Sequence, residues 1–125
     1  IICDIMGTVN FDRLFFRKNI MTSNTVTNEI IESKIVGLMY MNGADMAKVN
    51  GMNIGTETEN NLKRLTLCVV VMENGFILTG ESACVSADNY DEAMGKRIAF
   101  ENATNKMWPL LGYALREELF KDSLV

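Results

Sequence analysis

The sequence contains no histidine. Histidine is the usual general base, a common metal ligand and the partner of serine and cysteine nucleophiles in hydrolases. Its absence therefore excludes most triad hydrolases and many metalloenzymes. We expect a protein that is not an enzyme, and we assign no catalytic residue, no metal ligand and no cofactor.

Cysteine is scarce as well. The three cysteines, Cys3, Cys68 and Cys84, are an odd number without close CxxC spacing, so they indicate neither a disulfide framework nor a zinc ribbon. This usage is typical of a reducing cytoplasm. Cys84 lies near an expected helix start, where a thiol can become nucleophilic, but no base is evident and we interpret it as structural.

A basic excess and long apolar runs are also missing. The net charge of −4 argues against general nucleic-acid binding. The longest apolar runs, such as residues 65–72, fall far short of the ~20 residues that a membrane-spanning helix needs. With 48% hydrophobic residues in 125, the chain is expected to form one soluble globular domain.

The natural start of the protein is expected at Met21. The sequence does not begin with methionine, whereas Met21 precedes Thr-Ser-Asn, a good lead-in to a helix. We interpret residues 1–20 as a leader or a non-native extension, and residues 21–125 as a single α+β domain. The alternative is a native amphipathic arm that packs on the core through Phe11, Leu14, Phe15 and Phe16.

The N-terminal half of the domain has one helical pattern. From Thr27, apolar residues recur at three-to-four spacing, which predicts a helix capped near Asn24, Thr25 or Thr27 and ended by Gly43. The residues of this pattern are Ile30, Ile31, Ile35, Leu38 and Met39. Residues 42–61 have no clean period and are expected to form a long loop.

A β-hairpin is the clearest structural signal. Two β-rich runs over residues 62–85 flank Asn74-Gly75, the preferred pair of a type I′ turn. With this turn, one face is expected to carry Leu65, Leu67, Val69, Val71, Leu78, Gly80, Ser82 and Cys84. The other is expected to carry Cys68, Val70, Met72, Ile77, Thr79 and Ala83. Both faces are largely apolar, so helices, another strand or a second subunit must cover them.

Residues 91–121 have helical composition. Ser86, Asp88 or Asn89 can cap the start, and Pro109 either kinks this helix or opens a second one. The expected core stripe is Met94, Ile98, Met107, Leu111, Leu115 and Leu119. The opposite face carries Arg97, Glu101, Asn105, Trp108, Gly112 and Arg116. The predicted fold is α+β, with a hairpin packed by an N-terminal helix and a long C-terminal helix or helix pair.

The hairpin and the C-terminal helix region also resemble a known family. The segments that carry the resemblance are Leu-Thr-Leu-Cys-Val-Val-Val (65–71), Asn-Gly-Phe (74–76), Thr-Gly-Glu-Ser-Ala-Cys-Val-Ser (79–86), Asp-Asn-Tyr-Asp (88–91), Gly-Lys-Arg-Ile-Ala (95–99), Glu-Asn-Ala (101–103), Lys-Met-Trp (106–108) and Leu-Gly-Tyr-Ala-Leu (111–115). Together they resemble the phage gene-49/gene-66 family. Residues 1–20 and 42–61 depart from that pattern.

That family resembles, in size and layout, the Thoeris anti-defence sponges, which sequester glycocyclic ADP-ribose signals, and related sponges take up cyclic oligonucleotides. The resemblance implies a phage anti-defence protein in the cytoplasm of an infected bacterial host. It also implies a bound cyclic nucleotide that is not degraded, and a homo-oligomer, a dimer or higher. Largely apolar hairpin faces point to an oligomer as well.

A nucleotide site needs cations or backbone N–H groups for phosphate and an aromatic surface for the base. Arg97 and Arg116 are the candidate phosphate ligands, and Lys96 or Lys106 can add charge. The candidate stacking residues are Phe76, Tyr90 and Trp108. The candidates at the strand end before the helix are Ser82, Ser86 and Asn89. Each also has a plain structural reading as a solvated cation, a core aromatic or a helix cap.

Two other functions remain open from the sequence. The first is a protein–protein interaction module that inhibits a host factor by strand addition at the apolar hairpin. The second is an enzyme that degrades a nucleotide, for which the missing histidine leaves no evident base.

Overall fold

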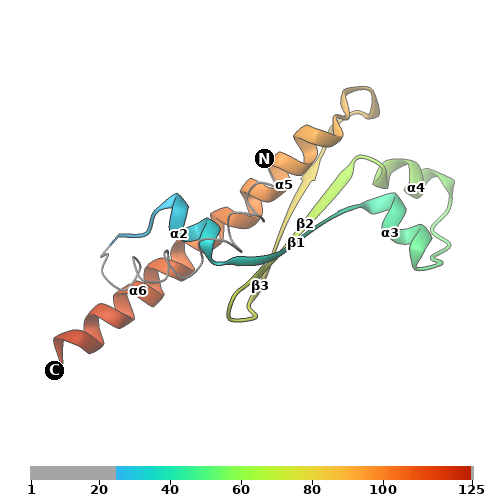
Figure 1. Ribbon diagram of the computed structural model, residues 1–125. Coiled ribbons are helices and arrows are strands. Elements are labelled where there is room, and N and C mark those ends of the chain that lie inside the picture. The colour runs from blue at the N-terminus through green and yellow to red at the C-terminus, as the bar shows by residue number, and fades with distance from the viewer. Residues whose placement is uncertain (1–24, 125) are drawn as a thin grey trace.

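The computed structural model describes residues 25–124, and the predictions made for residues 1–24 lie outside this range. The chain forms an α+β domain, as predicted, in which a long bent C-terminal helix packs against an antiparallel sheet (Figure 1). In chain order the elements are α2 (Asn28–Ser33), β1 (Ile35–Asn42), α3 (Gly43–Val49), α4 (Thr56–Leu62), β2 (Leu65–Met72), β3 (Ile77–Ala83), the short 3₁₀ helix η1 (Ala87–Asn89), α5 (Glu92–Asn105) and α6 (Met107–Ser123).

The sheet has three strands in the order β1-β2-β3, all antiparallel. The helix predicted from Thr27 to Gly43 is therefore wrong over most of its length, because α2 ends at Ser33 and β1 follows. Thr27 does cap α2, and its hydroxyl accepts a hydrogen bond from Ile30 N at 3.3 Å. Pairing with β2 satisfies the backbone of residues 35–42 and covers one edge of the hairpin, which overrides the helical spacing.

The hairpin is confirmed, but its register differs by one residue from the prediction. Val71 pairs with Ile77, so Thr66, Cys68, Val70 and Met72 share their face with Leu78, Gly80 and Ser82. The turn is a three-residue loop closed by Gly75 N donating to Met72 O at 2.9 Å. Only Gly75 has a positive φ there, at 89°, whereas a type I′ turn needs two such residues.

Residues 42–61 are not a loop throughout, which corrects the second N-terminal prediction. Asn42 ends β1 and caps α3, because its Oδ1 accepts from Ala44 N at 2.9 Å. A short connection then leads to α4, and the two helices lie together at the end of the sheet away from α6 (Figure 1). Seven-residue helices show fewer than two full turns of periodicity, so their pattern is weak.

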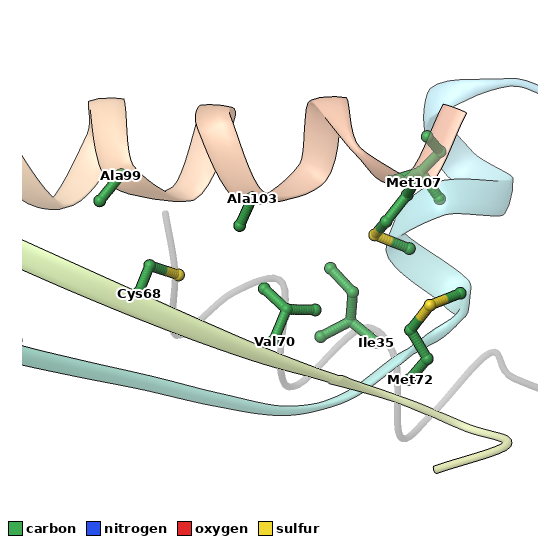
Figure 2. Close-up of a cluster of buried hydrophobic side chains, with 8 residues drawn as sticks. Ile35, Cys68, Val70, Met72, Ala99, Ala103 and Met107 are labelled. Carbon is green, nitrogen blue, oxygen red and sulfur yellow. The ribbon is translucent and has the colours of Figure 1, made fainter. Parts of the chain in front are cut away.

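The core lies between the sheet and α5. Figure 2 shows Ala99, Ala103 and Met107 on the helix side, facing Cys68 and Val70 of β2. Helix α5 approaches β3 at Gly80, where a Cβ would overlap the backbone of Ala99 and Ala103. Small residues therefore set the packing distance, and the predicted core stripe is only partly confirmed. Met107 is fully buried and Leu111 packs on the core, whereas Met94 is 49% exposed.

Helices α5 and α6 follow one another with a bend at Lys106 (Figure 1). Pro109 lies in the first turn of α6, as one of the two predicted alternatives had it. Proline has no N–H to donate to the carbonyl of Asn105, which is the last residue of α5. Most of α6 continues past the sheet, and Met107 is its one buried residue in the described part of the chain.

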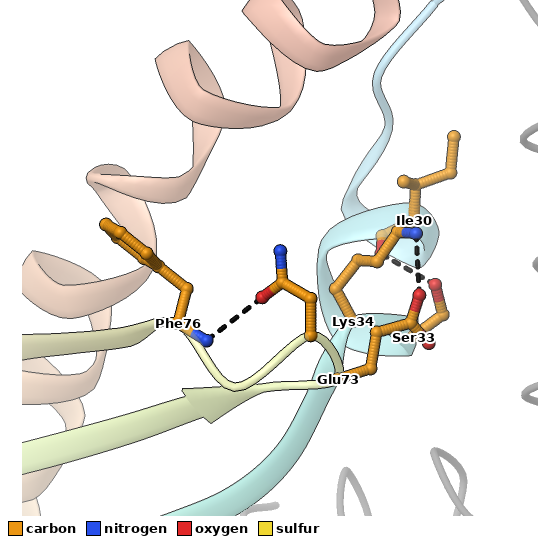
Figure 3. Close-up of polar contacts among 6 residues, drawn as sticks. Ile30, Ser33, Lys34, Glu73 and Phe76 are labelled. Carbon is orange, nitrogen blue, oxygen red and sulfur yellow. Dashed lines mark hydrogen bonds and ion pairs between the residues drawn. The ribbon is translucent and has the colours of Figure 1, made fainter.

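An ion pair joins the hairpin turn to the residue that precedes β1. Lys34 Nζ lies 2.8 Å from Glu73 Oε1, and Glu73 N donates to Lys34 O at 2.8 Å. Figure 3 shows Lys34 and Glu73 beside the turn, with Ser33 and Ile30 of α2 next to them. Both charged side chains are mostly buried, with 20% and 15% exposed, so this contact fixes the position of α2 against the sheet.

Candidate ligand-binding site

Helix α5 is capped by Asp91 and carries the main groove of the described residues. Asp91 Oδ1 accepts hydrogen bonds from Ala93 N at 3.0 Å and Met94 N at 3.3 Å, so Asp91 is the helix cap. The predicted caps are wrong for this helix, because Ser86 instead caps η1 by accepting from Asp88 N at 3.2 Å. The intervening 3₁₀ turn moves the helix start by several residues.

The groove follows the first three turns of α5 and has a volume of about 790 Å³. Its described lining consists of Asp91, Glu92, Ala93, Met94, Lys96, Arg97 and Phe100. Phe100 rests on the core and presents an aromatic surface to the groove. Two cations, Lys96 and Arg97, thus lie on the same surface as an aromatic ring and the thioether of Met94.

Both cations make only weak surface ion pairs. Arg97 Nη1 lies 3.4 Å from Glu101 Oε1 and Lys96 Nζ lies 3.1 Å from Glu92 Oε1, each one helical turn away. The Arg97 side chain is 60% exposed. Exposed pairs of this kind contribute about 0–1 kcal/mol, so an incoming phosphate can displace the carboxylate at little cost.

A smaller hollow of about 150 Å³ adjoins the groove and shares Glu92 and Lys96 with it. It lies where β1 and β2 meet the first turns of α5, and it is lined by Tyr40, Met41, Asn42, Asp45, Thr66, Tyr90, Glu92 and Lys96. A third hollow, of about 230 Å³, continues from Tyr40 toward Val49 and Asn50 of the α3 region. The small hollow therefore adjoins the groove on one side and the third hollow on the other.

Two hydroxyl oxygens beside the small hollow, Tyr40 Oη and Thr66 Oγ1, are sealed from solvent. Tyr40 Oη lies against the thiol of Cys68, whereas Thr66 Oγ1 has no hydrogen-bond partner among the described residues. Thr66 is 3% exposed, and Lys96 Nζ lies 5.8 Å from the centre of the Tyr40 ring. Burial raises the pKa of the Tyr40 phenol above its usual range, and the adjacent Cys68 adds to the rise. The phenol of Tyr40 is thus neutral at physiological pH.

The predicted cations do not meet in one site. Arg97 lies in the groove of α5, whereas Arg116 is exposed on α6, 19 positions further along. At 1.5 Å per residue this separation is roughly 28 Å, much more than a diphosphate spans. Trp108, 38% exposed at the start of α6, lies between them. Lys106 Nζ donates a hydrogen bond to Thr79 O at 2.6 Å, so this cation is bonded to strand β3.

The predicted residues around the β3–α5 connection are only partly brought together. Tyr90 lines the small hollow, and Ser82 lies opposite Thr66 on the core face. Ser86 and Asn89 belong to η1 and its cap. Phe76 is 50% exposed at the hairpin turn, at the opposite end of β3. It is therefore remote from Tyr90, at roughly 3.3 Å per strand residue.

Three residues that line the groove or the small hollow, Tyr40, Thr66 and Phe100, were not among the candidates from the sequence. Tyr40 lies in the segment that was predicted as a helix, so its pairing with Cys68 of β2 could not be predicted. Thr66 did carry a signal, because it is the one hydroxyl in the apolar run of β2 and it occupies one of the alternating buried positions of that strand. Within residues 25–124 no cluster of three or more cysteine, aspartate or glutamate side chains is arranged to hold a metal ion.

The described helices include none with the length and apolar character needed to cross a membrane. Fold and site together define a small α+β protein with a three-stranded antiparallel sheet, a long bent helix on one face and a mixed cationic and aromatic groove along that helix. The chain belongs to the Phage protein (N4 Gp49/phage Sf6 gene 66) family, whose model matches residues 26–119. No curated protein and no solved structure matches the chain.

Proposed function

We propose that this phage protein binds and sequesters a cyclic nucleotide immune signal, glycocyclic ADP-ribose or a cyclic oligonucleotide, without degrading it. The observation that carries the proposal is the groove of α5, where Lys96 and Arg97 lie beside Phe100. Family membership and the resemblance of the family to anti-defence sponges support the same function. Its place of action is then the cytoplasm of an infected bacterial host.

The groove supplies the contacts that a nucleotide requires. A guanidinium grips phosphate oxygens with two parallel hydrogen bonds, and an ammonium adds a mobile charge. The ring of Phe100 and the thioether of Met94 offer an apolar surface for a purine. The volume of about 790 Å³ is in the range of nucleotide-sized ligand sites.

The mechanism proposed is removal of the signal by tight binding, with no bond broken. The chain contains no histidine, so the groove lacks the side chain that most often acts as a general base. Sequestration then depends on affinity and on the number of sites. A homo-oligomer increases that number and is part of the proposal.

A second copy of the chain is the partner that fits α6 best. Four apolar residues lie on one side of this helix at positions spaced three, seven and four residues apart, and all are exposed. They are Leu110 (39%), Tyr113 (70%), Phe120 (49%) and Leu124 (70%). This spacing is typical of a helix that packs on another helix, and Glu117 lies between Tyr113 and Phe120 on the same side. We propose that α6 pairs between copies.

Inhibition of a host factor by strand addition is the second candidate function. It has less support than sequestration, because both edges of the hairpin are already in contact with other parts of the chain. One edge of the hairpin is covered by β1. At the other edge Asn102 donates to Glu81 O at 2.8 Å and Lys106 donates to Thr79 O, so two outward carbonyls of β3 are already bonded. A partner strand would have to displace the side chains of Asn102 and Lys106.

The test is a depletion and release assay. The purified protein is incubated with glycocyclic ADP-ribose isomers and a panel of cyclic di- and trinucleotides, removed by filtration, heated, and the released material is analysed. Depletion followed by recovery of intact ligand is the expected result. Depletion with an altered product would identify an enzyme. No depletion of any ligand would overturn the proposal in favour of a protein partner.

A further inference from the structure

The outer face of the sheet, which is turned away from α5, is apolar. The outward residues of the central strand β2 are Leu65, Leu67, Val69 and Val71. On the same face Met39 of β1 is 49% exposed and Ile77 of β3 is 59% exposed. An antiparallel face in contact with water normally carries polar residues at such positions. A contiguous apolar face of this kind marks an interaction surface.

The apolar side of α6 continues the side of α5 that packs on the sheet. Ala103 of α5 faces the sheet, and Leu110 and Glu117 follow it at intervals of seven residues, or about two helical turns. Lys106 at the bend keeps helical torsion angles, with φ −72° and ψ −19°, so the helical phase is carried into α6. This side of α6 is therefore turned toward the layer that the sheet occupies.

Most of α6 nevertheless continues past the end of its own sheet (Figure 1), and the apolar residues on this side are 39–70% exposed. A second copy of the chain offers a surface of matching length. Helix α6 is about 25 Å long and the strands β1 and β2 are about 26 Å long, from the usual rise per residue. The inner face of a second copy is already covered by its own α5, so the outer face is the one that can receive α6.

A reciprocal arrangement covers all these surfaces at once. If α6 of each copy lies on the outer face of the other, each sheet is enclosed between its own α5 and the α6 of its partner. The two contacts bury on the order of 1,000 Å² in total, for a helix about 10 Å wide and 25 Å long on each sheet. That area meets the lower limit of a specific interface, whereas one contact between two α6 helices buries about half of it.

We propose that the outer face of the sheet receives α6 of a second copy, in a reciprocal exchange between the two chains. This inference names the surface on which the α6 pairing of the proposed function takes place; it rests on that pairing and is independent of the nucleotide. A side with three-to-four spacing suits a sheet as well as a helix, since α5 packs on its own sheet through Ala99 and Ala103. Glu117, on this side of α6, can accept a hydrogen bond from the outward hydroxyl of Thr79 on β3.

Sedimentation of two matched lysine variants tests the outer face. Met39→Lys places a charge on that face, and Met52→Lys places the same charge between α3 and α4, where Met52 is 60% exposed. Both methionines are exposed to a similar extent, so both variants are expected to fold, as checked by circular dichroism. Met39→Lys is expected to raise the dissociation constant between copies at least tenfold, because its ammonium would lose water beneath α6. Met52→Lys is expected to leave that constant unchanged.

Disulfide cross-linking identifies the surface that α6 contacts. One chain carries Met39→Cys and a second chain, distinguished by its mass, carries Tyr113→Cys. In both chains serine replaces each native cysteine except Cys68, which is fully buried. Mild oxidation of the mixture is expected to give a covalent dimer of the two different chains. A mixture of Met52→Cys with Tyr113→Cys is the control, and it is expected to give no such dimer.

Two results would each overturn the exchange. The first is an unchanged dissociation constant in Met39→Lys, and the second is cross-linking of Tyr113→Cys chains with one another but not with Met39→Cys. In the second case the α6 pairing stands, and the two helices contact each other directly. A monomeric wild type would overturn the exchange and the α6 pairing together, whereas sequestration of a nucleotide is decided separately by the depletion and release assay.

Discussion

Glycine and alanine set the distance between α5 and the sheet. Gly80 on β3 lies directly beneath the helix backbone, and Ala99 and Ala103 are both fully buried. Hydrophobic periodicity could not find this contact, because it favours large residues such as Met94, which is half exposed. The small hollow depends on the same close approach, since Gly95 is the helix residue next to Thr66.

Replacing Gly80 with alanine is expected to lower the free energy of unfolding by about 3 kcal/mol, because the new methyl group must displace the backbone of α5. Gly112→Ala is the matched control. That residue lies within α6 with nothing near its Cβ, so the change is expected to raise stability by up to ~1 kcal/mol. Urea unfolding measures both, and equal stability of Gly80→Ala and the wild type would contradict the packing described.

The buried thiol of Cys68 makes stability depend on alkaline pH. Burial raises its pKa to about 11 from about 9, with Tyr40 acting in the opposite direction. The unfolded chain therefore releases this proton at lower pH than the folded protein does. The contribution to stability is complete below pH 9 and is lost as the pH rises toward 11, by on the order of 2 kcal/mol.

Unfolding measured from pH 7 to pH 11 is expected to show this decline, and Cys68→Ala is expected to reduce it. The phenol of Tyr40, whose pKa is also raised, adds to the decline at the upper end. Cys84→Ala serves as the control, because that thiol is only half buried. If stability declines by the same amount in Cys68→Ala as in the wild type, groups other than the Cys68 thiol cause the decline.

Elements were predictable from sequence where local signals and tertiary contacts agree. The hairpin was predictable from its β-rich runs and the Asn-Gly turn, and the helices of residues 92–123 from their helical composition. The structure contains the hairpin and both helices, α5 and α6. Residues 35–42 were predicted as a helix and form β1, because the pairing with β2 that decides their conformation lies some thirty residues away. The hairpin register failed by one residue for a local reason, the three-residue loop at Gly75.

The outer edge of β3 is protected by α5. Replacing Asn102 with alanine and Lys106 with methionine frees the carbonyls of Glu81 and Thr79, which then form an exposed strand edge. The double variant is expected to self-associate at concentrations where the wild type does not, as measured by light scattering. Lys121→Met, which removes a cation from the last turn of α6, is the control. No change in association would show that the edge is blocked in another way.

At the scale of the whole molecule, the predicted site residues are spread over several surfaces of one chain. Arg97 lies in the groove and Tyr90 in the hollow beside it, whereas Arg116 and Phe76 lie elsewhere. Helical spacing predicted Arg97 and Arg116 on one face of a continuous helix, but the chain bends at Lys106 and the two residues lie on different helices.

Pairing of α6 between copies is tested by sedimentation. The wild type is expected to be a dimer or a higher oligomer, and Leu110→Ser with Phe120→Ser is expected to shift it toward the monomer with unchanged helix content by circular dichroism. Val85→Ser is the control, because that residue is 96% exposed and lies apart from α6. An unchanged oligomer in the double variant would place the interface on another surface.

The central claim, that the groove of α5 holds a cyclic nucleotide signal, is tested most directly by the depletion and release assay on charge variants. The wild type is compared with Lys96→Met combined with Arg97→Met, and with Lys121→Met as a control of equal chemistry outside the groove. The account predicts that wild type and control deplete the ligand and release it intact, while the double variant depletes at least tenfold less. Depletion by the double variant equal to that by the wild type would contradict it.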